Sequence, residues 1–214
     1  MQLNQNQTEI LYVQDALCGW CYGFAPVIDQ IKKKFGNRLT LTPVHGGLWP
    51  GPKARKMDSA LVSHLLVGMP NVTAATGQVF GAAFREKIVN NPQFVYDTEP
   101  TARAAIVVRD LSPENELDFI KRVQTSFFLH GNDPTRAETF VDIAKDYGIQ
   151  PSDFMAQYTS TETVKNTLAD FAQSAAWGVA VLPTLLSRRD GRVGPLVSGS
   201  CTIDAASTLI EPLL

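Results

Sequence analysis

Cysteine is scarce in this sequence, with three among 214 residues. Three are too few for the disulfide framework of a small secreted domain, and an odd number cannot pair completely within one chain. An excess of one charge is missing too, because 19 basic and 21 acidic residues leave a formal net charge of -2. Such a chain has no electrostatic footprint for nucleic acid or an anionic membrane. We therefore expect its partners to be small molecules and other proteins.

Long apolar runs are missing as well. No window approaches the roughly 18 apolar residues that indicate a transmembrane helix, and the chain has neither repeats nor low-complexity segments. Residues 1–10 contain no lysine or arginine and no apolar core, so they lack both parts of a secretory signal. These features predict a globular, cytoplasmic protein with no membrane partner.

A strand–helix–strand unit is predicted near the start of the chain. Residues 10–14 form a short apolar, β-rich run, and residues 39–45 alternate like a second strand. Between them, residues 19–35 show helical spacing of apolar side chains and end in three lysines followed by glycine, a typical helix stop. A Cys-x-x-Cys motif, formed by Cys18 and Cys21, lies where the first strand meets the helix.

The middle of the chain has helical periodicity throughout. Prolines at expected first turns and glycines at expected stops divide it into separate helices. They are predicted over 52–66, 73–89, 100–111, 112–127 and 133–148, with a short last helix from Pro151. We therefore predict an inserted helical subdomain.

The last part of the chain mixes helix and strand again. A helix is expected over 161–177, with Val164, Leu168 and Phe171 on its apolar side. A strand-like run interrupted by Pro183 follows, and then an Asp-Gly hairpin signal, a return strand and a closing helix.

The order of elements predicts the fold class. A β-α-β start and an α-β-β-α end are typical of an α/β fold whose mixed central sheet is covered by helices on both faces. We predict that residues 1–51 and 159–214 form this domain, and that residues 52–158 form the inserted helical subdomain.

The segment Leu17-Cys18-Gly19-Trp20-Cys21-Tyr22 carries the chemistry. At a helix N-terminus the first sulfur faces unpaired backbone N–H groups and the positive end of the helix dipole, which favour thiolate over thiol. The thiolate is the attacking species in disulfide exchange. Two intervening residues place the second sulfur one turn deeper in the helix. We therefore predict that Cys18 attacks and that Cys21 resolves the mixed disulfide.

Other uses of a Cys-x-x-Cys motif fit less well. A structural zinc site usually needs four Cys or His ligands, whereas this chain has no second cysteine pair and its histidines, His45, His64 and His130, are scattered. A c-type haem site needs His after the second cysteine, where Tyr22 stands. No metal site is expected, and a pair of inert, buried cysteines stays open as an alternative.

Three motifs together carry a resemblance to a known family. Cys-x-Trp-Cys-Tyr-Gly-Phe-Ala-Pro at 18–26, Gly-Gly-Leu at 46–48 and Leu-Pro-Thr at 182–184 resemble the DsbA-like thioredoxin superfamily, in particular its cytoplasmic branch of predicted protein-disulfide isomerases. The resemblance covers essentially the whole chain. It implies a DsbA-like thioredoxin fold with a large inserted helical subdomain and thiol–disulfide oxidoreductase activity on protein or peptide disulfides. DsbA itself has Pro where Gly19 stands and His where Trp20 stands, so here no nearby cation stabilises the attacking thiolate.

The resemblance also implies roles for residues outside the cysteine pair. Thioredoxin folds have a kinking proline in the first helix, at Pro26 here, and a cis-proline that faces the redox motif, at Pro183 here. The backbone of Leu182 would then pair with an extended substrate segment and keep metal ions from the thiols. The candidate substrate-binding residues are thus Trp20, Leu182, Pro183 and Thr184.

Three further residues have two interpretations each. Asp15 is a candidate proton relay to Cys21, as buried acids are in related folds, although a solvated or capping carboxylate is the more usual role. His45 at a strand end is either structural or catalytic, and we favour the structural role. Cys201 is either an inert thiol, which we favour, or a regulatory thiol open to glutathionylation.

Two other functions are compatible with such a fold. Kappa-class glutathione transferases and 2-hydroxychromene-2-carboxylate isomerases resemble the chain in outline, but they typically have Ser at the first position and need no resolving cysteine. A non-enzymatic peptide-binding module using a groove around Trp20 and Pro183 is the third candidate. No cofactor is expected beyond glutathione as a redox partner, and oxidase, reductase and isomerase activities are not separable from the sequence.

Overall fold

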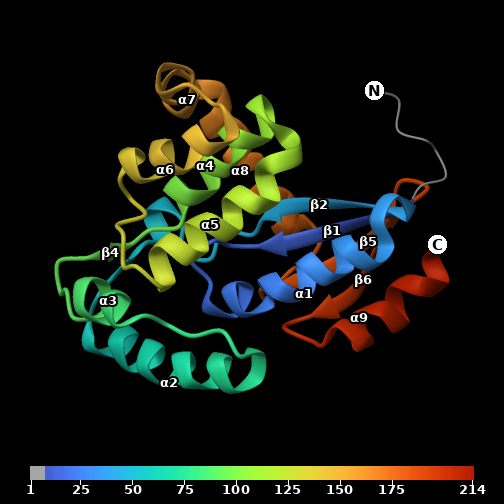
Figure 1. Cartoon of the computed structure of the whole chain (residues 1–214), viewed down its shortest axis with the longest axis horizontal. Coiled ribbons are helices and arrows are strands. Elements are labelled where there is room, and N and C mark those ends of the chain that lie inside the picture. Colours follow the sequence, from blue (N-terminus) through green and yellow to red (C-terminus); the bar gives the residue numbers. More distant parts are fainter. Residues whose placement is uncertain (1–7) are drawn as a thin grey trace.

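A four-stranded mixed sheet forms the centre of the protein in a computed structural model that describes residues 8–214 (Figure 1). The strand order is β2-β1-β5-β6. Strand β1 pairs in parallel with β2 and antiparallel with β5, and β5 pairs antiparallel with β6. The strands are Thr8–Gln14 (β1), Leu39–His45 (β2), Thr184–Arg189 (β5) and Arg192–Ser198 (β6).

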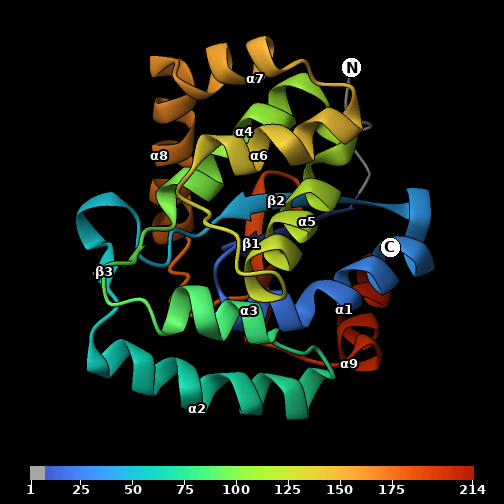
Figure 2. The same ribbon diagram turned by 60° about the vertical axis from the view of Figure 1, so that its left-hand side comes forward.

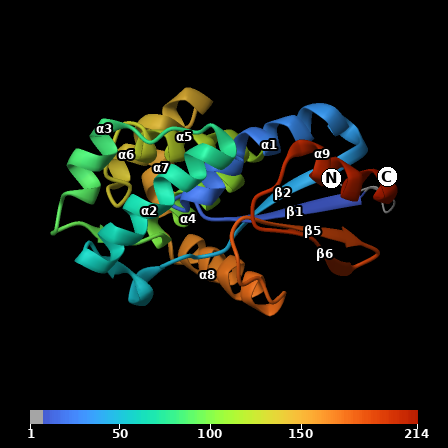
Figure 3. The ribbon, with the colours of Figure 1, turned by 90° about the horizontal axis from the view of Figure 1, so that it is seen from below.

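Strand β1 is apolar along its length because both of its faces are covered. Ile10 and Tyr12 pack in the core formed with helices α1 and α9, whereas Leu11 and Val13 pack in a cluster on the opposite face, as the two-residue period of a strand requires. Figure 3 shows α1 and α9 on one side of the sheet and α8 on the other. These helices are Gly19–Phe35 (α1), Thr161–Ala176 (α8) and Ile203–Ile210 (α9).

A largely helical segment lies between β2 and α8 in the sequence. In Figure 2, α2 runs along one side of the molecule, and α4, α6 and α7 lie on the opposite side. One core joins α4 to α7, and a second, rich in phenylalanine, packs against Leu17 and Tyr22 of the cysteine motif. The helices are Ser59–Thr76 (α2), Ala82–Phe84 (α3), Glu99–Leu111 (α4), Glu116–Phe128 (α5), Ala137–Ala144 (α6) and Pro151–Tyr158 (α7), and a short ribbon pairs Arg55–Lys56 (β3) with Val95–Tyr96 (β4).

Several expectations from the sequence are confirmed. The α/β class with a mixed central sheet covered by helices on both faces is correct (Figure 3), and α1 begins and ends where its periodicity predicted. The Asp-Gly hairpin is present, with positive φ at Asp190 and Gly191. The described part of the chain holds no helix of the length and apolarity needed to cross a bilayer. The expectation about a secretory signal rests largely on residues 1–7, which lie outside the described residues.

The first two helices predicted for the insert are wrong. Residues 59–76 form one helix, because the Asp58 carboxylate accepts a hydrogen bond from Leu61 N (2.8 Å) at its start and Gly77, with φ of 76°, ends it. Pro70 lies inside this helix. The short strands β3 and β4 were not predicted, since two residues are too few to show a period.

The predicted buried face of α8 is also wrong. Its buried residues are Thr163, Thr167 and Ser174, whereas Leu168 is 54% exposed. Small hydroxyl side chains allow α8 to pack closely on α4, α7 and β2. The Thr167 hydroxyl donates to Thr163 O (2.8 Å), so its burial leaves no unpaired group.

Candidate active site

Cys18 lies at the junction of β1 and α1. It is the N-cap residue of α1, with an extended backbone and with Tyr22 N donating to its carbonyl (3.0 Å). Its own N–H donates to Asp15 O (3.1 Å), which closes the turn from the strand into the helix. The sulfur therefore stands where the first N–H groups of α1 have no partner in the helix.

Cys21 lies one turn further along α1 and has no exposed surface. Both thiols are free, and the Cys21 side chain hydrogen-bonds to that of Cys18. Burial raises the pKa of the Cys21 thiol well above its ordinary value, and the hydrogen bond and the charge of Cys18 raise this pKa further. Cys21 thus keeps its proton and donates it toward the sulfur of Cys18, an arrangement that favours Cys18 as the nucleophile.

The loop before β5 faces the first cysteine. The Leu182–Pro183 peptide bond is cis, as the resemblance implied. The carbonyl oxygen of Leu182 lies 3.8 Å from Cys18 Sγ and accepts a weak hydrogen bond from it. The Thr184 hydroxyl donates to Val181 O (2.7 Å), which holds the loop in this shape. The structure therefore brings Cys18, Leu182 and Pro183 together.

Asp15 is buried rather than solvated, with 3% of its surface exposed. Its two carboxylate oxygens accept hydrogen bonds from Leu17 N (2.9 Å) and Leu48 N (2.7 Å). Burial raises the pKa of Asp15, and these two N–H groups oppose part of the rise. The alternative of a solvated group is wrong and that of a capping group is confirmed, because the buried carboxylate accepts backbone N–H groups, that of Leu17 within the turn. It also interacts electrostatically with Cys21, and its role as a proton relay stays a prediction.

A cleft of about 300 Å³ opens beside Cys18. It has an apolar wall, and the side chains described around it include no Lys, Arg, Asp or Glu. Trp20, 38% exposed, lies at its edge together with Leu182. Residues of α2 and the flanking loops complete it, among them Trp49, His64, Leu65, Met69, Val72 and Phe80.

The sequence did not predict the α2 side of this cleft. Its residues lie far from the cysteines in the chain and reach the site only through tertiary packing. The one available signal was the apolar character of residues 61–72, which is equally typical of a core-facing helix.

His45 belongs to a buried polar network and not to the cleft. Its Nδ1 is 3.1 Å from Gln14 Nε2, and its Nε2 is 3.4 Å from a carboxylate oxygen of Glu116. Arg109 pairs with Glu116 and Asp170, each at 2.9 Å. Burial lowers the pKa of Arg109, but these two carboxylates outweigh burial and raise it. The network joins β2, α4, α5 and α8, in agreement with a structural role for His45.

Metal ligands and the third cysteine were the remaining questions about the chemistry of the site. Among residues 8–214, His, Cys, Asp and Glu side chains form no group of three or more that could hold a metal ion. Cys201 is half-buried and packs against the core between α1 and α9. Burial raises the pKa of its thiol, which lowers its reactivity.

Comparison with known proteins gives matches among solved structures alone, since no family model and no curated protein matches the sequence. A "putative protein disulfide isomerase" from Nitrosomonas europaea is 28% identical with a TM-score of 0.88, over 96% of this chain and 97% of that one. The cytosolic disulfide reductase DsbM from Pseudomonas aeruginosa is 22% identical with a TM-score of 0.79, over 96% and 98%. The structure of DsbM with GSH is 21% identical with a TM-score of 0.77, and the match covers 96% of this chain and 98% of that one.

The structural neighbours place this protein among the enzymes of the thiol–disulfide oxidoreductase class. Within this class, its structural neighbours are the DsbA-like thioredoxin-fold proteins, including cytosolic DsbM.

Proposed function

We propose that this enzyme exchanges disulfides in protein or peptide substrates, with Cys18 as the attacking and Cys21 as the resolving thiol. The observation that carries the proposal is the asymmetry of the pair. Cys18, 6% exposed, stands at the start of α1 in the wall of the cleft, whereas Cys21 has no exposed surface and donates a hydrogen bond to Cys18.

The exchange proceeds in two displacements. The Cys18 thiolate attacks one sulfur of the substrate disulfide, and the other sulfur leaves as a thiolate that takes up a proton. Cys21 then loses its proton and attacks Cys18, so that a Cys18–Cys21 bond forms and the second substrate sulfur leaves. The enzyme is oxidised by two electrons and the substrate is reduced to a dithiol. Reversal of the same steps transfers a disulfide to a substrate dithiol.

The cis-proline loop is the proposed binding edge for the substrate. The carbonyl of Leu182 points toward Cys18, so an extended segment that pairs with this backbone would present its sulfur to the nucleophile. Trp20 lies beside this edge, and the buried Pro183 and Thr184 hold the loop in place behind it. The uncharged wall of the cleft favours apolar residues beside the substrate cysteine.

Glutathione is the proposed redox partner, and the cytoplasm the proposed compartment. DsbM is a cytosolic disulfide reductase and has been solved with GSH, which supports both assignments. Two molecules of glutathione would reduce the Cys18–Cys21 disulfide and leave as one molecule of glutathione disulfide. The same cleft is compatible with a kappa-class transferase, but that activity has no use for a buried second thiol.

Trapping of the mixed disulfide tests the proposal. In a Cys21→Ser variant we expect a peptide disulfide to add to Cys18 and to stay there, which intact-protein and peptide mass spectrometry detect. The Cys18→Ser variant is the matched control and should form no adduct. An adduct on Cys21 in that control, at the rate seen for Cys18, would overturn the assignment.

A further inference from the structure

Tyr12 is a buried phenol with no role in the mechanism above. It lies in the middle of β1, is 3% exposed, and points to the α1 side of the sheet. Its hydroxyl lies 3.5 Å from the carbonyl oxygen of Cys21 and hydrogen-bonds to the Cys21 side chain. Burial raises the pKa of Tyr12 well above its ordinary value, and the charges of Cys21 and Cys18 raise it further. The phenol therefore stays protonated, and its O–H donates to the Cys21 carbonyl oxygen, which leaves the phenol oxygen free to accept from the Cys21 thiol.

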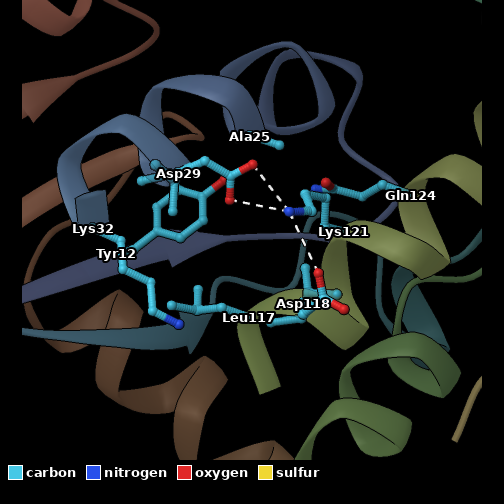
Figure 4. A pocket seen from close by; sticks show the side chains of 10 residues that line it. Tyr12, Ala25, Asp29, Lys32, Leu117, Asp118, Lys121 and Gln124 are labelled. Atoms are coloured by element: carbon cyan, nitrogen blue, oxygen red, sulfur yellow. Dashed lines mark hydrogen bonds and ion pairs between the residues drawn. The ribbon is translucent and has the colours of Figure 1, made fainter. Parts of the chain in front are cut away.

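The second observation is a cavity of about 140 Å³ between α1 and α5, in which the Tyr12 ring is part of the wall (Figure 4). Ala25 and Ile28, one and two turns after Cys21 on α1, line it as well. A water needs roughly 10–15 Å³ of such space, so the cavity has room for several. At its rim Lys121 pairs with Asp29 (3.0 Å).

Gln124 gives this cavity a polar group that water can hydrogen-bond. The residue is 1% exposed and lines the cavity, and its amide Nε2 is buried without a protein partner. A buried amide without a partner is costly, and ordered water is the usual remedy. The cavity thus leads from the Tyr12 phenol past a polar, unpaired group to a charged rim.

We propose that Tyr12 is a proton-transfer residue for Cys21 and that the cavity between α1 and α5 connects it to solvent. The inference rests on the proposed exchange function. As Cys21 attacks Cys18 in the mixed disulfide, the Tyr12 oxygen accepts the thiol proton, while the phenol O–H turns from the Cys21 carbonyl and passes its own proton to cavity water. The leaving substrate thiolate takes up a proton from solvent. The Cys21–Cys18 bond forms, the bond from Cys18 to the substrate sulfur breaks, and the phenol ends unchanged.

Asp15 does not make this route redundant. Its oxygens accept the backbone N–H groups of Leu17 and Leu48, which hold the carboxylate on the turn before α1. Tyr12, in contrast, reaches Cys21 from the strand side and touches the cavity directly. The titratable groups that face Cys21 are thus Cys18, Asp15 and Tyr12.

A single-turnover experiment separates the two displacements. Reduced protein is mixed with an aromatic disulfide that releases one coloured thiolate when Cys18 attacks and a second when Cys21 resolves. We expect Tyr12→Phe to slow the second release about tenfold, the loss of one hydrogen bond to a charged group, and to leave the first unchanged. The half-maximal pH of the second release should rise, because the Cys21 thiol loses the group that accepts its proton. Tyr158→Phe, which removes a phenol in α7, should alter neither release.

The cavity itself is tested by Gln124→Leu, which removes the unpaired amide at similar size. We expect a several-fold slower second release and a smaller solvent-deuterium effect on it; this variant also serves if Tyr12→Phe does not fold. If the rate of the second release in the folded variants is within twofold of the wild-type rate, the inference is overturned. Absence of any second release in the wild-type protein would instead contradict the exchange function.

Discussion

Cys18 and Cys21 carry the same functional group, and their surroundings give the two thiols different chemistry. Cys18 meets the open start of a helix, a carbonyl of the cis-proline loop and the cleft. Cys21 is enclosed by α1, Asp15 and the Tyr12 phenol. Burial disfavours a charged sulfur, so we expect Cys21 to react only after the first displacement has brought a disulfide next to it.

This difference is measurable by alkylation. In Cys18→Ser we expect iodoacetamide to modify Cys21 at least tenfold more slowly than a free cysteine at about pH 8.5, the ordinary thiol pKa. The raised pKa of Cys21 keeps it protonated there, and the rate should climb only at higher pH. In Cys21→Ser, Cys18 should react faster than Cys21 does. Both variants should be alkylated equally after unfolding in urea, and equal rates in the native state would contradict the account.

At the scale of elements, the site depends on the close approach of α1 and α2. Gly23 in α1 faces the last turns of α2, and a Cβ there would lie 2.8 Å from Val72 Cγ1 and 2.9 Å from Thr76 Cγ2. Val72 also lines the cleft beside Cys18. The absence of a side chain at Gly23 therefore sets how near the cleft wall lies to the cysteine helix.

A pair of glycine substitutions tests this packing. Gly23→Ala should destabilise the protein by about 1–3 kcal/mol through overpacking. Gly68→Ala, in α2 with no atom within 4 Å of the added Cβ, should stabilise it by roughly 0.5–1 kcal/mol. Urea unfolding measures both changes. If Gly23→Ala were as stabilising as Gly68→Ala, the helices would not be in the close contact described.

Elements with local signals were predictable from the sequence. Helix α1 has apolar residues at helical spacing along its length and a basic last turn before Gly36. The Leu182-Pro183 loop was predicted from its resemblance to related chains. The buried face of α8 was not predictable, because Thr163 and Thr167 are buried for close packing and not for their hydrophobicity. The division into two subdomains stays a prediction.

The candidate site also has a part that the sequence predicts and a part that it does not. The two cysteines lie close together in the sequence, so their motif could be recognised there. The environment of Asp15 was missed because acidic residues are rarely buried without partners, and its partners, such as Leu48, come from another part of the chain. Tyr12 was missed since an aromatic residue in a strand is normally core. Only the packing of α1 on β1 shows that its hydroxyl reaches Cys21.

For the whole molecule, one largely buried ion network joins strand β2 to helices α4, α5 and α8. Arg109 in α4 bonds to Glu116 in α5, to Asp170 in α8 and to the carbonyl of Pro43 in β2. Asp170 also accepts from His45 N (3.1 Å). Four elements therefore depend on a single guanidinium.

Removal of this guanidinium should weaken the whole fold. Arg109→Met leaves Glu116, which is 5% exposed, and Asp170 without their cation, and we expect a loss of about 3 kcal/mol, as for other broken buried pairs. Lys145→Met breaks an exposed pair with Asp142 and should change stability by less than about 1 kcal/mol. Urea unfolding followed by both fluorescence and circular dichroism would show the change. A loss no larger than that of Lys145→Met would contradict the role of the network.

The central claim is that Cys18 and Cys21 form one redox couple, and equilibration against glutathione mixtures tests it most directly. Thiols are trapped by alkylation at each ratio of reduced to oxidised glutathione, and the disulfide is located by peptide mass spectrometry. We expect one two-electron transition, with the disulfide between Cys18 and Cys21. It should vanish in either single Ser variant and persist unchanged in Cys201→Ala. A disulfide involving Cys201, or two cysteines that never form a bond across the titration, would contradict the account.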